Sequence, residues 1–329
     1  MQNSNEVGQS LAKSPEVSDN EPFQEFAQKQ IKMFRILFTE DMKSCFQQCT
    51  DQFNNAYFLY NYGYYGCCQF DLGPEMMGGS GDQIGDKGAS GLGIALANCI
   101  NLSNLALFLI DNKIGAQGAS GLGSALANCT NLSNLTLHLS RNEIGDQGAL
   151  GLGFALANCT NLSNLALYLI RNKINAQGAL GLGSALANCT NLSNLTLNLN
   201  SNEICEQIVQ NFGSAFTNCT SLSSLTLNLN ENKIGAQGAS GLGSALANCT
   251  NLSNLTLYLS RNEIGEQGVL GLSSALANCA NLSNLTLYLS ENKIGAQGAS
   301  ILGSNLANCT NLSNLTLYLS SFNLFIAFF

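Results

Sequence analysis

Residues 114–143 read IGAQGASGLGSALANCTNLSNLTLHLSRNE, and close copies of this stretch fill most of the chain. From Ile84 onward the sequence restarts every 30 residues, which gives eight copies. A repeat of this length overrides the usual expectation of separate compact domains, because each copy is too short to bury a core alone. The sequence therefore predicts one elongated solenoid.

Two spacings inside the copy predict its secondary structure. Leu135, Leu137 and Leu139 alternate with polar residues, which is typical of a short strand with one buried face. Gly118 and Leu122 lie four residues apart, as expected for the buried face of a helix. Stacked copies would align strand on strand, about 4.8 Å apart. Helix axes need about 8 to 10 Å, so we expect the stack to curve with the sheet on its concave side.

The second half of the copy follows L-x-x-L-x-L-x-L-x-x-N-x-I, in Leu132, Leu135, Leu137, Leu139, Asn142 and Ile144. This pattern resembles the leucine-rich repeat, specifically the long, helix-bearing type of ribonuclease inhibitor and its relatives. The resemblance implies an α/β, right-handed solenoid or horseshoe, with a parallel sheet on the concave face and helices on the convex face.

One inward leucine, Leu139 in this copy, is additional to the common family pattern. It predicts a strand about two residues longer than usual. Similar long-strand arrays occur in families of ciliate proteins, some of which are named as kinase-domain proteins. The chain has no V-A-I-K, H-R-D and D-F-G set, so we do not expect kinase activity.

The copies fill residues 84–321, and four other segments make up the remainder. Residues 1–21 are polar and acidic and are expected to be disordered. Residues 22–72 carry apolar residues at helical spacing and predict a helical N-terminal cap that shields the first repeat. Residues 73–83 are rich in glycine and predict a tether. Residues 322–329 form an apolar C-terminal tail. Three interpretations stay open: the tail folds over the last repeat, the array is incomplete, or this edge docks onto another molecule.

Composition argues against several functions. Only 10% of the residues are charged and the net charge is -8, which disfavours binding to the phosphates of nucleic acids or membranes. The sequence shows no secretory signal and no apolar run of about 18 residues, so we expect a cytoplasmic protein.

Eight of the thirteen cysteines recur once per copy, as Cys129 does. In a reducing compartment they should act as small buried apolar groups, so no metal or other cofactor is expected. The role of Cys45, Cys49, Cys67 and Cys68, which precede the repeats, stays open.

Catalysis is not expected. The glycine-rich stretches recur in each helix, whereas a phosphate-binding loop would occur once, after one strand. The single histidine, His138, has no partner base or metal cluster that the sequence identifies. Because no unrepeated set of nucleophile, base and acid is visible, the sequence predicts a protein that is not an enzyme.

Candidate binding residues lie in two columns of equivalent positions that we expect to point outward from the concave face. The first, here called the ring column, is rich in aromatic residues and comprises Phe108, His138, Tyr168, Asn198, Asn228, Tyr258, Tyr288 and Tyr318. Tyrosine is enriched where proteins bind proteins, which favours a contact surface. Cross-strand support of the sheet is the alternative.

The second, here called the turn column, varies most in charge and comprises Asp111, Arg141, Arg171, Ser201, Glu231, Arg261 and Glu291. Such variation would match the charge pattern of a partner. Two residues further along, Lys113, Glu143, Lys173, Glu203, Lys233, Glu263 and Lys293 alternate in charge. We expect this alternation to form a ladder of ion pairs between repeats, and the building unit to be a pair of repeats.

The fifth copy departs from the others, with bulky or polar residues at Cys205, Ile208, Asn211, Phe212 and Phe216. It marks either a central recognition patch or drift in a redundant array.

The sequence thus predicts a non-catalytic scaffold or adaptor that binds a protein through its concave face. The alternative is a protein that regulates an enzyme, such as a small GTPase, by binding it. The sequence identifies neither the partner nor the oligomeric state.

Overall fold

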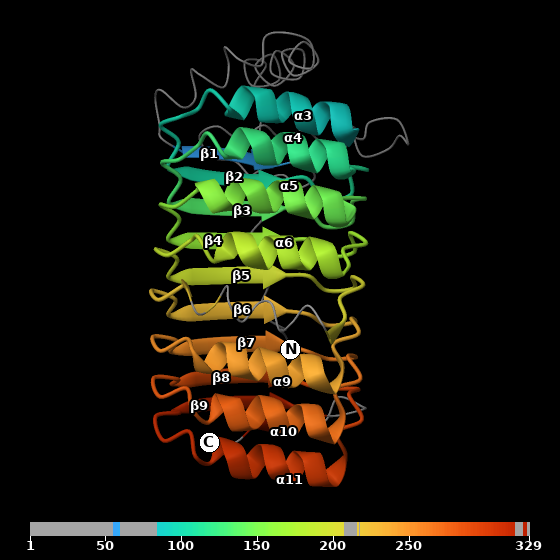
Figure 1. The fold of residues 1–329 in the computed structure, drawn as a ribbon, viewed down its shortest axis with the longest axis vertical. Coiled ribbons are helices and arrows are strands. Elements are labelled where there is room, and N and C mark those ends of the chain that lie inside the picture. Colours follow the sequence, from blue (N-terminus) through green and yellow to red (C-terminus); the bar gives the residue numbers. More distant parts are fainter. Residues whose placement is uncertain (1–54, 60–83, 207–215, 217, 320–324, 328–329) are drawn as a thin grey trace, which may run out of the picture.

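The structure is a computed structural model that describes residues 55–59, 84–206, 216, 218–319 and 325–327. Strands and helices alternate along the repeats, and the helices lie over one face of the sheet (Figure 1). The strands form one ten-stranded sheet in sequence order: β1 Asn55–Leu59, β2 Asn104–Phe108, β3 Asn134–His138, β4 Asn164–Tyr168, β5 Asn194–Asn198, β6 Ser224–Asn228, β7 Asn254–Tyr258, β8 Asn284–Tyr288, β9 Asn314–Tyr318 and β10 Phe325–Ala327.

The helices of the described residues stack in the same order as the strands. They are α3 Gly85–Leu96, α4 Ala116–Leu126, α5 Gly145–Asn158, α6 Ala176–Leu186, α9 Gly235–Ala247, α10 Gly265–Leu276 and α11 Gly295–Leu306. Strands β1 to β9 pair in parallel, and within the repeats each residue pairs with its equivalent 30 positions away, as Leu135 does with Leu165. The architecture is the predicted α/β solenoid.

Leucines fill the space between the sheet and the helices. Leu135, Leu137 and Leu139 are buried, as are Leu122 and Leu126 on the helix that faces them. Their equivalents join one continuous apolar core that runs through all the repeats. The repeats therefore share a single core, and each one depends on its neighbours for burial.

Backbone pairing continues past the last residue of strands β2 to β8, through the additional inward leucine. Each repeat strand has five residues, but the Leu139 amide donates to the Tyr168 carbonyl at 2.9 Å. The Arg141 amide continues the ladder by donating to the Ile170 carbonyl at 2.7 Å. The backbone pairing thus reaches the turn.

A buried asparagine joins consecutive repeats at this turn. The Asn142 Oδ1 accepts hydrogen bonds from the amides of Asn112 (2.9 Å), in the preceding repeat, and of Ile114 (3.0 Å), the first residue of its own repeat. Its Nδ2 donates to the carbonyls of Leu109 (2.8 Å) and Leu139 (2.9 Å). Most of these bonds recur at Asn172, Asn202, Asn232, Asn262 and Asn292.

The repeated cysteines also lie in the core. Cys129 is fully buried, and its Sγ donates to the Leu96 carbonyl of the preceding repeat at 3.4 Å. Burial raises the pKa of this thiol to about 12, so it stays protonated at neutral pH. These cysteines act as small buried groups, as predicted.

The first and last strands of the sheet, β1 and β10, were not predicted from the sequence. Residues 55–59 lie in the predicted helical cap, but they form strand β1, which pairs in parallel with β2. The helical expectation is wrong for these five residues, because β2 offers an open edge of hydrogen-bonding groups that a strand can satisfy. In the apolar tail, β10 pairs antiparallel with β9, with Phe325 opposite Tyr318. Residues 1–54, 60–83, 320–324 and 328–329 lie outside the described residues.

Helix starts follow a two-repeat pattern in the N-terminal half. The Asp86 Oδ1 accepts hydrogen bonds from the amides of Gly115 (2.7 Å) and Gly118 (2.8 Å), which begin the next repeat's helix α4. Asp146 binds the start of α6 in the same way, at 2.8 and 2.9 Å. Alternate repeats have alanine at this position, as at Ala116 and Ala176. A carboxylate in one repeat therefore caps the helix of the next.

Candidate partner-binding face

The candidate site is the face of the sheet that points away from the helices, here called the strand face. Along each strand the inward leucines are buried, whereas outward residues such as Thr136 and His138 are half-buried. The regular register places equivalent outward residues side by side across the sheet. The ring column predicted from the sequence therefore lies on this face as a continuous row.

The aromatic residues of the ring column form two separate groups. In the N-terminal group, the His138 ring centroid lies 6.0 Å from that of Phe108 and 4.7 Å from that of Tyr168. In the C-terminal group, Tyr288 stacks between Tyr258 and Tyr318, with centroid distances of 4.3 and 4.1 Å. The ring planes of this tyrosine stack lie within 10° of parallel.

Partial burial sets the protonation of both groups. It lowers the pKa of His138, so the imidazole is neutral at pH 7. Burial and a hydrogen bond with Tyr318 raise the pKa of Tyr288, so this phenol keeps its proton. Both groups therefore present uncharged rings, which combine apolar area with polar atoms at their edges.

Asparagines separate the two aromatic groups. The Asn198 Oδ1 accepts from the Asn200 amide at 3.1 Å, and the Asn228 Oδ1 accepts from the Asn230 amide at 3.0 Å. The side-chain oxygens of Asn198 and Asn228 thus bind the chain that follows β5 and β6. The centre of the strand face is therefore polar, whereas the ring column on either side of it is aromatic.

The fifth copy contributes to this centre only in part. Cys205 is half-buried, and Phe216, which replaces a leucine, is fully buried in the core. Ile208, Asn211 and Phe212 lie outside the described residues.

The turn column lies just beyond the ends of the strands. All seven members have a positive φ, between 53° and 59°, so each occupies a left-handed turn conformation. Ser201 is half-buried and the other six are exposed. The structure thus presents the predicted charged column in one backbone conformation at the edge of the strand face.

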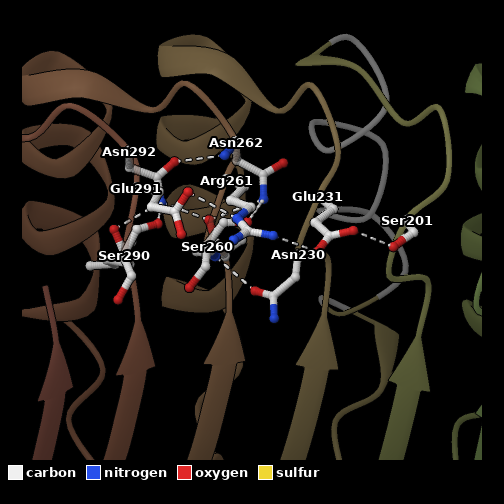
Figure 2. Close-up of polar contacts among 11 residues, drawn as sticks. Ser201, Asn230, Glu231, Ser260, Arg261, Asn262, Ser290, Glu291 and Asn292 are labelled. Carbon is white, nitrogen blue, oxygen red and sulfur yellow. Dashed lines mark hydrogen bonds and ion pairs between the residues drawn. The ribbon is translucent and has the colours of Figure 1, made fainter. Parts of the chain in front are cut away.

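Four members of the turn column form a chain of polar contacts across consecutive repeats (Figure 2). The Ser201 Oγ donates to the Glu231 Oε2 at 2.7 Å. The Arg261 guanidinium lies 3.0 Å from the Glu231 Oε1 and 2.9 Å from the Glu291 Oε2. The hydrogen bond from Ser201, together with the bond and charge of Arg261, lowers the pKa of Glu231.

Arg141 and Arg171 differ from Arg261. Among the residues that the structure describes, neither makes an ion pair within 4.0 Å, although Asp111 belongs to the same column. Their turns are adjacent, because the Arg141 amide donates to the Ile170 carbonyl. Two exposed cations therefore lie on neighbouring repeats at the N-terminal end of the turn column.

The predicted Lys/Glu ladder does not form ion pairs. Within the described part of the chain, Lys113, Glu143 and their equivalents make none within 4.0 Å, and the ion pairs lie in the turn column instead. Lys113 has a positive φ of 52°, whereas Glu143 forms a β-bridge with Gly115. These two neighbours thus differ in backbone conformation, whereas Glu263 and Lys293 share a positive φ of 58° and 56° and still form no ion pair within the described residues.

The described residues also lack two other features. They contain no group of three or more histidine, cysteine, aspartate or glutamate residues that could hold a metal ion. No helix among them is long and apolar enough to cross a membrane.

Comparison with known families agrees with this geometry. Residues 131–153 and 221–243 match the family model described as Leucine Rich repeat. Each match begins just before a strand (β3 or β6) and runs through the asparagine turn into the next helix (α5 or α9). The chain is thus similar to the leucine-rich-repeat family over these two stretches. No curated protein matches the chain.

The two columns were predicted from the sequence, but which of their members lie in contact was not. The structure brings Phe108, His138 and Tyr168 together, and it brings Tyr258, Tyr288 and Tyr318 together. It separates these groups by Asn198 and Asn228. The cap formed by Asp86 was also missed, although the alternation of acid and alanine at this position was a visible signal.

Proposed function

We propose that this protein is a non-catalytic scaffold or adaptor that holds a protein partner on its strand face. The observation that carries the proposal is the ring column. Its two aromatic groups lie half-buried on the outward side of the sheet, while the inward leucines complete the core. The stability of the core thus depends chiefly on the inward residues, which leaves the outward rings available for contact.

Two further features support protein rather than another class of partner. Leucine-rich-repeat families typically mediate contacts between proteins. Tyrosine is enriched at the centres of protein interfaces, where its ring contributes area and its hydroxyl a hydrogen bond. The turn column adds charged side chains at the edge of the same face, which is the usual arrangement of a polar rim around an apolar centre.

The test compares partner capture by three forms of the full-length chain. One carries Tyr258→Ala, Tyr288→Ala and Tyr318→Ala. The matched control carries Phe154→Ser, because Phe154 is an aromatic residue on the helix face, 61% exposed, and most equivalent positions have serine. Proximity labelling identifies partners of the unchanged chain, and pull-down with each purified form measures their capture.

We expect the tyrosine variant to lose capture by about tenfold or more, as hot-spot aromatic residues do. The Phe154 variant should capture partners like the unchanged chain. Thermal unfolding checks that the tyrosine variant is folded. Equal capture by a folded tyrosine variant, or loss of capture on changing Phe154 alone, would contradict binding through the strand face.

A further inference from the structure

The backbone conformation of the turn column is unusual for residues with long charged side chains. Its left-handed conformation suits glycine, asparagine and aspartate, and it is unfavourable for residues with longer side chains. Of its seven members, only Asp111 belongs to that favoured set. The turn conformation alone therefore does not account for arginine and glutamate at these positions. The contacts of their side chains are a separate reason for their presence.

For the C-terminal members, contacts within the protein supply that explanation. Arg261 joins Glu231 and Glu291 through ion pairs of 3.0 and 2.9 Å, and Ser201 extends the chain of contacts (Figure 2). Arg141 and Arg171 have no equivalent ion pairs among the described residues. Both arginines are exposed and lie at neighbouring turns.

The surroundings of this arginine pair are more basic than the chain as a whole. The three turns 111–113, 141–143 and 171–173 carry four cations (Lys113, Arg141, Arg171 and Lys173) against two anions (Asp111 and Glu143), with Asp146 a third anion at the start of α5, although the net charge of the chain is -8. The strands leading into the two arginine turns end at His138 and Tyr168, whose rings lie 4.7 Å apart. A basic pair thus lies beside an uncharged aromatic surface.

We propose that Arg141 and Arg171 bind the carboxylates of an extended acidic segment of the protein partner, which also contacts the rings of His138 and Tyr168. This inference rests on the proposed function and specifies the chemistry of the partner. A guanidinium donates two parallel hydrogen bonds to a carboxylate, and adjacent turns offer two such groups to acidic residues along one segment. A long phosphate polymer is disfavoured, because the rest of the acidic chain would repel it.

The probe is a displayed library of random 16-residue peptides, selected against the full-length chain and then measured as labelled synthetic peptides. The test variant carries Arg141→Asn and Arg171→Asn. The matched control is Arg261→Asn, which changes the same column and the same backbone conformation, but at an arginine already paired with Glu231 and Glu291. Asparagine suits the left-handed turn, so both variants should unfold no more readily than the unchanged chain.

We expect selection to enrich peptides with several aspartate or glutamate residues. Their affinity should fall about tenfold or more in the double variant, change little in Arg261→Asn and weaken as salt is raised. Peptides that lose affinity only in the Tyr258/Tyr288/Tyr318 variant would overturn this inference but keep the strand face as the binding site. Failure to enrich acidic peptides overturns the inference, as does tighter binding of a single-stranded oligonucleotide than of the selected peptides. Peptides insensitive to both sets of changes would contradict the proposed function as well.

Discussion

At the scale of the residue, the fold depends on buried polar groups that join one repeat to the next. Asn142 satisfies the backbone amides of Asn112 and Ile114 and the carbonyls of two leucines, all buried away from water. A buried amide without a partner costs more than the net gain from an ordinary hydrogen bond. The asparagine therefore specifies the conformation of the turn that carries the charged column.

Replacing Asn142 with alanine should lower the free energy of unfolding by about 3 kcal/mol, because the amides of Asn112 and Ile114 lose their acceptor. The matched control is Asn134→Ser, at an outward position where another repeat has Ser224. Its cost should stay below about 1 kcal/mol. Urea unfolding measures both, and equal losses in the two variants would show that Asn142 has no special role.

The buried cysteines that recur once per repeat predict how the free energy of unfolding depends on pH. Burial raises the pKa of Cys189 and Cys249 in the folded state to about 12, as it does for Cys129. In the unfolded chain these thiols lose their protons near pH 9, which stabilises the unfolded state. Stability should therefore be full below pH 9 and fall as the pH rises, by about 1 kcal/mol per thiol at pH 9.5.

Unfolding in urea at pH 7.5 and 9.5 measures this dependence. A Cys129→Ala variant should show a smaller loss between the two pH values than the unchanged chain, because one titrating thiol is gone. A loss of the same size in both would mean that other groups cause the dependence.

At the scale of the element, the sequence predicted the strands and helices of the repeats well, because their burial is periodic. The alternation of Leu135 and Leu137 with polar residues indicates a strand, and the four-residue spacing from Gly118 to Leu122 indicates a helix. Strand β1 was not predicted, because residues 55–59 carry no leucine pattern and owe their conformation to the open edge of β2. Edge pairing depends on tertiary structure, which local spacing does not encode.

The carboxylate caps between repeats also belong to this scale. Asp146→Ala should lower the free energy of unfolding by about 1 to 2 kcal/mol, because the amides of Asn175 and Gly178 lose their acceptor. The equivalent Glu266 makes no such hydrogen bond within the described residues, so Glu266→Ala should cost less than about 0.5 kcal/mol. Thermal or urea unfolding compares the two, and a larger loss at Glu266 would argue against the cap.

At the scale of the whole molecule, stacking converts small differences between repeats into a patterned surface. Register aligns every column, so substitutions in single repeats give the strand face an aromatic N-terminal group, an amide centre and a C-terminal tyrosine stack. The sequence predicted the columns, since a period of 30 residues fixes which residues are neighbours. It did not predict that, among the described residues, ion pairs would form at Arg261 and not at Lys113, since both residues have a positive φ.

Site-specific photo-cross-linking tests the central claim most directly. A benzoylphenylalanine residue replaces either Tyr288 on the strand face or Phe154 on the helix face of the full-length chain. The chain is irradiated in its native cell extract, and covalent products are separated and identified. We predict that the probe at Tyr288 forms a discrete product with a partner protein and the probe at Phe154 does not. A discrete product from Phe154 alone would place the binding surface on the helices and contradict the account.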